Sequence, residues 1–245
     1  MKNHDILYPA IKSETTEHLQ VSKIHSIFIR RAGNPKGIPV LVIHGGPGAG
    51  CSESDFRFFD PDIYNITLVD QRGAGESKPH GEMEENHTDA LIADFETLRK
   101  KLSISSWLLF GGSWGSTLAL AYAQSHPRSC LGLILRGLWL AREKEFDYFF
   151  NHIGDSFPER EEELINFLPK EEQKDLLSSY YKRLMDRDPK VHMPAARMFA
   201  QYEFGASWHD PNPDLANLLS NDKLTLGLAR TECHFMVNQM FLSPN

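Results

Sequence analysis

The pentapeptide Gly111-Gly112-Ser113-Trp114-Gly115 separates two segments of different character. The apolar residues 107–110 predict a buried strand, and the alanine- and leucine-rich residues 116–123 predict a helix. A Gly-x-Ser-x-Gly motif between a strand and a helix is the pattern of a nucleophile elbow, in which a sharp turn strains the serine backbone. The flanking glycines leave room for the close approach of strand and helix. The alternative is an ordinary glycine-rich turn, because the motif also occurs by chance.

In such an elbow the Ser113 hydroxyl projects above the sheet edge, and the backbone N–H of Trp114 points to where a substrate oxyanion would form. We therefore predict that Ser113 is a catalytic nucleophile and that Trp114 supplies one donor of an oxyanion hole.

A second glycine-rich loop, His44-Gly45-Gly46-Pro47-Gly48, follows the continuous apolar run 39–43. A loop at the end of a central strand can bring a backbone N–H beside the nucleophile, and glycine keeps the substrate carbonyl accessible. We predict that Gly46 is the second oxyanion donor, with a plain Gly-Pro turn as the alternative. The place of His44 on this loop suggests that it shapes the loop by hydrogen bonding.

The remaining pattern alternates strands with helices, which is typical of a parallel sheet with right-handed crossovers. Residues 18–31 alternate as expected for two antiparallel strands with one solvated face. The other predicted elements are buried strands over 39–43, 66–70 and 131–135 and a helix over 89–102. The turn after residue 70 contains Asp70 and Arg72, for which we expect a structural Asp–Arg contact in preference to a catalytic role.

After Gly137 the chain becomes rich in charged residues and helix formers. We predict an α/β core over 1–139, a helical cap over 140–222 that covers the catalytic edge of the sheet, and a helix returning toward the core over 223–245. The acidic run 159–163 reads as a solvated helix face.

Composition excludes several classes of function. The 245 residues carry a formal net charge of −7 and no basic stripe, which argues against nucleic acid as a partner. The start of the chain lacks an apolar signal region, and the longest apolar segment, 131–141, is too short to cross a membrane. The three cysteines are far apart and odd in number, which favours reduced thiols in a cytoplasmic protein over disulfides or a zinc site. We expect no metal and no cofactor.

Three stretches together resemble the proline iminopeptidases, α/β-hydrolases of the S33 serine peptidase type. They are His-Gly-Gly-Pro-Gly at 44–48, Asp-Gln-Arg-Gly-Ala-Gly-Glu-Ser at 70–77 and Gly-Gly-Ser-Trp-Gly-Ser-Thr-Leu at 111–118, supported by Leu-Arg-Gly at 135–137. The resemblance runs from about residue 5 to the last residue. It implies an α/β-hydrolase fold with a mostly parallel sheet and an inserted helical cap.

The resemblance also implies an activity, the removal of N-terminal proline from peptides through an acyl-enzyme. Glutamates of the family that match Glu203 and Glu232 bind the free amino terminus of the substrate, and a desolvated ammonium does require carboxylate partners. The aromatic residues Trp139 and Phe149 are candidates to pack on the pyrrolidine ring, with a role in the core as the alternative.

The chain departs from the family pattern after Gly137. We find no apolar strand followed by a Gly-x-x-Asp turn, and none of the later histidines, at 152, 192, 209 and 234, matches the family's catalytic histidine. We therefore expect a C-terminally truncated member that lacks the last two β–α units, the triad acid and the triad histidine, and that is inactive as given. Its strand over 131–135 would then be an exposed apolar edge.

Two other functions stay open at this point. The chain could be a non-catalytic remnant that acts as a peptide-binding module. A general esterase is a weaker alternative, because it does not explain the two glutamates or Trp114. Dehalogenases and epoxide hydrolases of this fold use aspartate at the elbow, so Ser113 argues against them.

Overall fold

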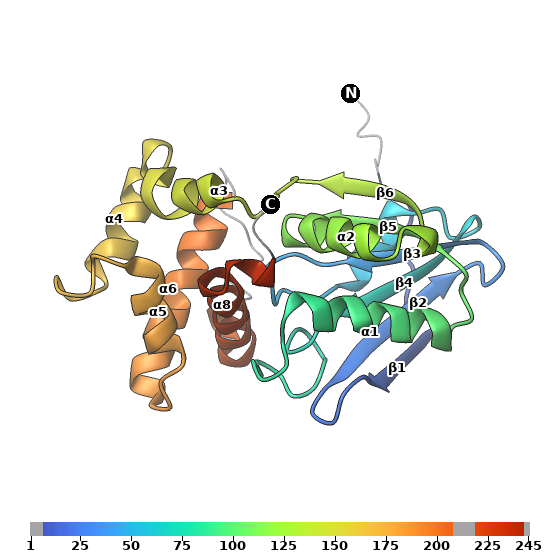
Figure 1. Ribbon diagram of the computed structural model, residues 1–245, viewed down its shortest axis with the longest axis horizontal. Coiled ribbons are helices and arrows are strands. Elements are labelled where there is room, and N and C mark those ends of the chain that lie inside the picture. Colours follow the sequence, from blue (N-terminus) through green and yellow to red (C-terminus); the bar gives the residue numbers. More distant parts are fainter. Residues whose placement is uncertain (1–6, 208–218, 243–245) are drawn as a thin grey trace. The chain divides into compact units, whose positions relative to one another are not determined.

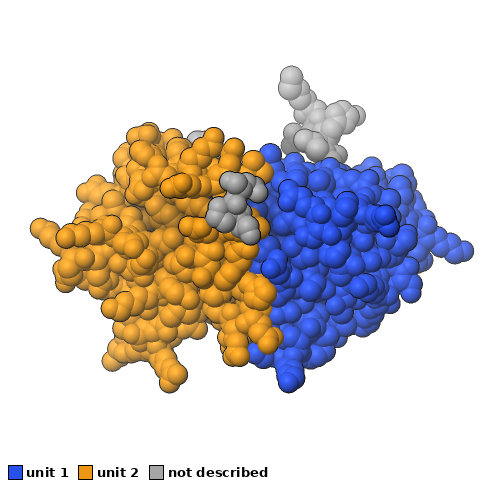
Figure 2. Space-filling view, viewed as in Figure 1, with its two compact units in different colours: residues 1–80, 88–139 blue, residues 81–87, 140–245 orange. Residues whose placement is uncertain are grey.

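The computed structural model describes residues 7–207 and 219–242 (Figure 1) and divides into two compact units (Figure 2). The first unit comprises residues 1–80 and 88–139, and the second comprises residues 81–87 and 140–245. The loop 81–87 and the last helix both belong to the helical second unit. The predicted division into 1–139, 140–222 and 223–245, and the covering of a catalytic edge by residues 140–222, stay predictions.

The first unit contains a six-stranded sheet in the order β1-β2-β4-β3-β5-β6. Strands β1 and β2 pair antiparallel, β2 also pairs antiparallel with β4, and β3, β4, β5 and β6 are parallel to one another. The bounds are Thr15–Gln20 (β1), Ser26–Gly33 (β2), Ile38–Ile43 (β3), Tyr64–Asp70 (β4), Trp107–Gly112 (β5) and Cys130–Arg136 (β6). Each strand predicted from the sequence is present.

The two faces of the sheet are covered by different elements. On one face Val40, Val42 and Phe110 pack with Phe56 and Phe59 of the 3-10 helix Glu53–Phe58 and its end. On the other face lie the helices α1 (Thr88–Lys101) and α2 (Trp114–Ser125). The buried Tyr122 of α2 receives a hydrogen bond from the Trp107 indole of β5 and donates one to Glu96 of α1, which ties both helices to the strand.

The second unit is helical. Its elements are α3 (Glu143–Asp147), a π-helix (Tyr148–His152), the 3-10 helix Ile153–Asp155, α4 (Pro158–Asn166), α5 (Leu176–Leu184), α6 (Pro189–Ser207), α8 (Asp222–Val237) and the 3-10 helix Gln239–Phe241. Helix α8 packs against α5 and α6. In α4 the residues Glu159, Glu162 and Glu163 are exposed, as expected for a solvated face. No helix of the described residues is long and apolar enough to cross a membrane.

Strand β6 forms an edge of the sheet and is not the fully buried strand that its apolar sequence indicates. In the described part of the chain it pairs only with β5, and Leu131, Leu133 and Ile134 are 56%, 38% and 43% exposed. Because Leu133 and Ile134 are neighbours in a strand, they point to opposite faces, so apolar surface is open on both sides of the edge. Long apolar edges of this kind recruit other chains.

We therefore expect the chain to self-associate through β6. Leu133→Lys introduces a charge into the exposed edge and should weaken self-association by roughly tenfold or more. Ile63→Lys is the matched control, because Ile63 is 50% exposed in a turn outside the edge. Sedimentation velocity over a range of concentrations measures the effect, and a monodisperse unsubstituted chain would contradict the prediction.

Candidate active site

Ser113 precedes α2 in the strained conformation that the motif predicts. Its backbone angles are φ 53° and ψ −125°, in a region that non-glycine residues rarely occupy. Its side chain is exposed, whereas Gly112 and Trp114 on either side are buried. The turn therefore presents one hydroxyl at the surface of an otherwise buried segment.

Close backbone contacts explain the glycines around Ser113. A Cβ atom on Gly111 would lie 2.2 Å from the carbonyl oxygen of Gly115, and one on Gly115 would lie 2.2 Å from the carbonyl oxygen of Ile43. Neither position can accept a side chain. Strand β5, the start of α2 and the end of β3 thus approach one another as closely as bare backbone permits.

Hydrogen bonds hold the elbow in place. The N–H of Ser113 donates to the carbonyl of Arg136 at 3.1 Å, which ties the turn to the end of β6. The Ser113 carbonyl accepts from the N–H of Ser116 at 2.8 Å and from the Ser116 hydroxyl at 2.6 Å. The backbone of Ser113 is therefore fully engaged, while its hydroxyl makes no capping bond to the helix.

The loop 44–48 lies beside the elbow. A Cβ atom on Gly45 would be 3.1 Å from the carbonyl oxygen of Gly112 and 3.4 Å from Cβ of Ser113. Gly46 has φ 102°, a conformation that favours glycine. The structure therefore brings together the segments that contain Ser113, Trp114 and Gly46, all within the first unit.

A buried hydrogen-bond network links these segments through Gln71. The Gln71 side chain accepts from the Trp114 indole at 2.9 Å and donates to the His44 carbonyl at 2.9 Å. The Gln71 N–H donates to Nε2 of His44 at 3.0 Å, which leaves the proton on Nδ1, 2.8 Å from the Gly45 carbonyl. No sequence pattern identifies Gln71 as part of this network, since only its place directly after β4 distinguishes it.

His44 shapes the loop, as expected, because both of its ring nitrogens are used in this network. Burial lowers the pKa of His44, although the nearby Asp70 opposes that effect. The imidazole is therefore held neutral.

The expected contact between Asp70 and Arg72 is wrong, although both residues are structural. Arg72 forms a buried bidentate pair with Asp94 of α1, with both N···O distances 2.7 Å. Asp70 instead accepts from Arg30 at 3.1 Å and from the backbone N–H groups of Cys51 and Glu76. Nothing in the sequence pattern distinguishes these partners, because Arg30 and Asp94 come from other elements.

The two aromatic candidates are placed in different units. Trp139 is half-buried in the first unit, where its N–H donates to the Ser116 hydroxyl at 3.2 Å and its carbonyl accepts from the Thr117 hydroxyl at 2.6 Å. Its backbone is thus fixed to the first turn of α2. Phe149 belongs to the second unit and packs edge-on against Tyr202, with ring centroids 5.2 Å apart.

Glu203 of α6 and Glu232 of α8 lie in the second unit and interact electrostatically. Glu232 is 3% exposed, and its Oε2 atom has no hydrogen-bond partner among the described residues. Burial raises the pKa of Glu203 to about 7. Burial and the neighbouring Glu203 raise the pKa of Glu232 well above its ordinary value. An unsatisfied buried carboxylate oxygen beside a second carboxylate is the chemistry of a site for a cation that donates hydrogen bonds.

The later histidines make other contacts. His234 has Nδ1 3.3 Å from the Tyr181 hydroxyl and Nε2 3.0 Å from the Asn86 carbonyl. His192 contacts the Asp186 carbonyl, and His152 pairs with Asp147. His209 lies outside the described residues. In the described part of the chain, no histidine is hydrogen-bonded to Ser113.

Comparison with known proteins identifies the family of the chain. The family model for the alpha/beta hydrolase fold matches residues 38–224. A probable proline iminopeptidase of Leptolyngbya boryana is 44% identical over 241 residues, covering 98% of this chain and 75% of the relative. A proline iminopeptidase of Arabidopsis thaliana is also 44% identical over 241 residues, which cover 98% of this chain and 63% of that protein.

Solved structures agree on the fold. An epoxide hydrolase of the alpha/beta hydrolase superfamily, from a metagenome of a hot environment, matches with a TM-score of 0.58 at 16% identity, over 89% of this chain and 70% of that one. A proline iminopeptidase-related protein of Thermus thermophilus matches with a TM-score of 0.50 at 21% identity, over 80% of this chain and 68% of that one. At these identities the likeness concerns the fold alone.

The neutral state of His44 predicts a pH dependence of stability. Because the folded pKa is lowered below the ordinary 6.5, the unfolded chain binds more protons, and the contribution of His44 to stability is complete above that value and lost as the pH falls below it. His44→Gln keeps an acceptor near the Gln71 N–H but does not titrate. The difference in unfolding free energy between wild type and His44→Gln should therefore shift in favour of wild type as the pH rises from about 5 to about 8.

Urea denaturation across that range measures the difference. Subtraction of the variant removes the opposing effect of Glu203 and Glu232, whose raised pKa values act alike in both proteins. Asn166→Gln, an exposed substitution in α4 that removes no titratable group, is the control and should leave the pH dependence unchanged. A pH-independent difference between wild type and His44→Gln would count against a neutral buried imidazole.

Proposed function

Since this chain belongs to the α/β-hydrolase family that includes the proline iminopeptidases, we propose that it acts on peptides with a free N-terminal proline, with Glu203 and Glu232 as ligands of the amino terminus and Ser113 as the nucleophile that attacks the proline carbonyl. The observation that carries the proposal is the Glu203–Glu232 pair, in which a buried carboxylate oxygen of Glu232 has no partner among the described residues.

The role of Ser113 is supported by its exposed hydroxyl on a strained turn between buried neighbours. In the proposed reaction the Ser113 oxygen bonds to the proline carbonyl carbon and the peptide C–N bond breaks. The proton of the Ser113 hydroxyl passes to the leaving nitrogen, so the rest of the peptide departs as a free amine and proline stays attached as an acyl-enzyme. Water then attacks the ester, its oxygen stays with the released proline as a carboxylate oxygen, and one of its protons restores the Ser113 hydroxyl. The N–H groups of Trp114 and Gly46 would stabilise the oxyanion, because both segments lie next to Ser113 and glycine leaves the approach open.

The role of the glutamates follows from charge and hydrogen bonding. A secondary ammonium at the N-terminus of a proline peptide carries one positive charge and two N–H donors. Two desolvated carboxylates supply the opposite charge and the acceptors, so they offset the cost of removing the ammonium from water. A blocked N-terminus supplies no charge and is rejected. Trp139 remains a candidate for the contact with the pyrrolidine ring.

The proposal predicts that ligand binding releases protons. The raised pKa values of Glu203 and Glu232 mean that the empty site holds protons near pH 7, and a bound ammonium lowers both pKa values. Calorimetric titration with L-prolinamide should therefore show release of roughly one proton, measured as a dependence of the heat on the ionisation enthalpy of the buffer. N-acetyl-L-prolinamide, which lacks the charge, should not bind detectably.

Substitution tests the same site. Glu232→Gln should weaken L-prolinamide binding by about 100-fold or more, because it removes one buried charge from the pair, and should reduce the proton release to the contribution of Glu203. Glu162→Gln, on the exposed face of α4, is the control and should change neither quantity. If N-acetyl-L-prolinamide bound with the same affinity as L-prolinamide, the proposed recognition of a free amino terminus would be wrong.

The proposed nucleophile also requires a base, and we propose that none of the described histidines supplies it. Both ring nitrogens of His44 are engaged by Gln71 and Gly45, and both of His234 lie at hydrogen-bond distance from Tyr181 and Asn86. A triad serine without its histidine loses on the order of 10⁶ in turnover.

The 245-residue chain should accordingly release no 4-nitroaniline from L-proline 4-nitroanilide beyond the rate of Ser113→Ala, and a fluorophosphonate probe should not label it. Turnover at an ordinary enzymatic rate that Ser113→Ala stops would show that a histidine of this chain acts as base. His209 and His234 would then be the first to substitute.

The second candidate function is that of a non-catalytic peptide-binding module. The same lack of a described base favours it, and the two functions share the glutamate site. Binding of L-prolinamide without turnover and without labelling of Ser113 would select the module, whereas labelling of Ser113 would select the enzyme.

A further inference from the structure

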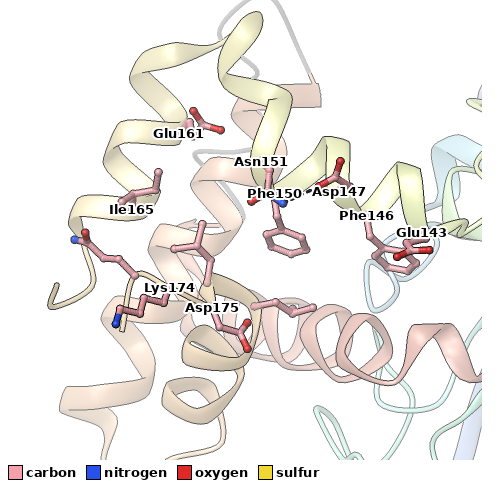
Figure 3. A pocket seen from close by; sticks show the side chains of 12 residues that line it. Glu143, Phe146, Asp147, Phe150, Asn151, Glu161, Ile165, Lys174 and Asp175 are labelled. Atoms are coloured by element: carbon pink, nitrogen blue, oxygen red, sulfur yellow. Dashed lines mark hydrogen bonds between the residues drawn. The ribbon is translucent and has the colours of Figure 1, made fainter. Parts of the chain in front are cut away.

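The second unit contains a hollow of about 580 Å³ that plays no part in the proposed chemistry (Figure 3). It is lined by residues of α3, the π-helix, α4, the connection to α5 and the start of α5. This volume is in the range of pockets that enclose a small organic molecule.

Apolar side chains form part of the lining. Phe150 is 8% exposed, and its ring packs edge-on against Phe149, with centroids 4.9 Å apart, which fixes its orientation. The other apolar residues of the hollow, Phe146, Ile165, Leu176 and Leu177, are half-buried. An apolar ligand group could therefore bury the part of their surface that is still accessible to solvent, which favours binding.

The charged groups of the hollow are mostly acidic. Glu143, Asp147, Glu161 and Asp175 line it together with one basic residue, Lys174 (Figure 3). Two of these carboxylates already have partners: Asp147 accepts from Asn151 at 2.9 Å and pairs with His152, and Asp175 accepts from the Ser178 N–H at 3.1 Å. Glu143 and Glu161 have no ion pair within the part of the chain that the structure describes.

Glu161 lines the hollow from α4 and is half-buried. Its carboxylate lies against the backbone of Gly154, where a Cβ atom would be 2.0 Å from Oε2. Figure 3 shows Glu161 projecting from α4 on the side of Asn151 and Phe150. A half-buried carboxylate beside apolar side chains attracts a cation more strongly than an exposed one does, because water screens it less.

We propose that this hollow is a second binding site, for a small organic cation that joins an ammonium group to an aromatic or branched apolar body. Charge complementarity selects the ammonium, for which Glu161 is the main partner. The apolar residues cover the body of the ligand. The site is distinct from Glu203 and Glu232, which do not line the hollow.

The probe is 2-phenylethylammonium. The control ligand is 3-phenylpropionate, which has a similar apolar group but carries a negative charge. Chemical-shift changes of backbone amides in ¹⁵N-labelled protein locate and quantify binding. We expect 2-phenylethylammonium to shift amides of α3, α4 and α5, an effect that weakens as NaCl is raised, and 3-phenylpropionate to shift none.

Glu161→Gln should weaken binding about tenfold, because it removes the charge and keeps the shape. Glu162→Gln, the next residue of α4 and outside the hollow, should leave it unchanged. Leu177→Ala should also weaken binding, which tests the apolar contribution in a second, independent variant.

The same titration of Glu232→Gln separates this proposal from the proposed function. Retained shifts around the hollow show a site that does not depend on the glutamate pair, even if L-prolinamide binding is lost. Equal binding of the anion, equal affinities of Glu161→Gln and Glu162→Gln, or loss of the shifts in Glu232→Gln would each overturn the second site.

Discussion

The first unit depends on one constraint, the close packing of bare backbone around the elbow. Gly111 lies against the carbonyl oxygen of Gly115, and Gly115 lies against the carbonyl oxygen of Ile43 at the end of β3. These contacts allow the ends of β3 and β5 and the first turn of α2 to lie close together at Ser113. They also account for the strained φ of 53° at Ser113. A side chain at either glycine would separate the elements, so the exposed hydroxyl and the packing of the sheet have the same origin.

A buried hydrogen-bond network stabilises this geometry. Gln71 joins the indole of Trp114 to the carbonyl and ring of His44, so the elbow and the loop 44–48 cannot move independently of the turn after β4. Every polar atom named in this network is paired, which a buried network requires if it is to stabilise the fold. The cost of keeping His44 neutral is small near physiological pH, because its ordinary pKa of 6.5 is already below that range.

The sequence predicts those parts of the structure that depend on local pattern. The strands, the helices α1 and α2 and the strained Ser113 all follow from periodicity and from the spacing of glycines. The exposed edge at β6 does not, because its apolar sequence by itself indicates a strand buried on both faces. The partners Arg30 and Asp94 do not, because they come from elements distant along the chain and any nearby opposite charge fits the same pattern. The sequence likewise does not predict that residues 81–87 belong to the helical unit, since this depends on tertiary packing.

The proposed ammonium site at Glu203 and Glu232 also bears on the stability of the fold. Two ionised carboxylates close together, with Glu232 buried, would repel each other and lose hydration, which costs several kcal/mol. The raised pKa values of both groups mean that the pair binds protons at a higher pH than free carboxylates do, which limits this cost. In the proposed function a ligand ammonium would replace those protons, and the free energy of binding would depend on a charge that only an unblocked amino terminus brings. Selectivity for a free amino terminus would then have the same origin as the raised pKa values, the desolvation of the two carboxylates.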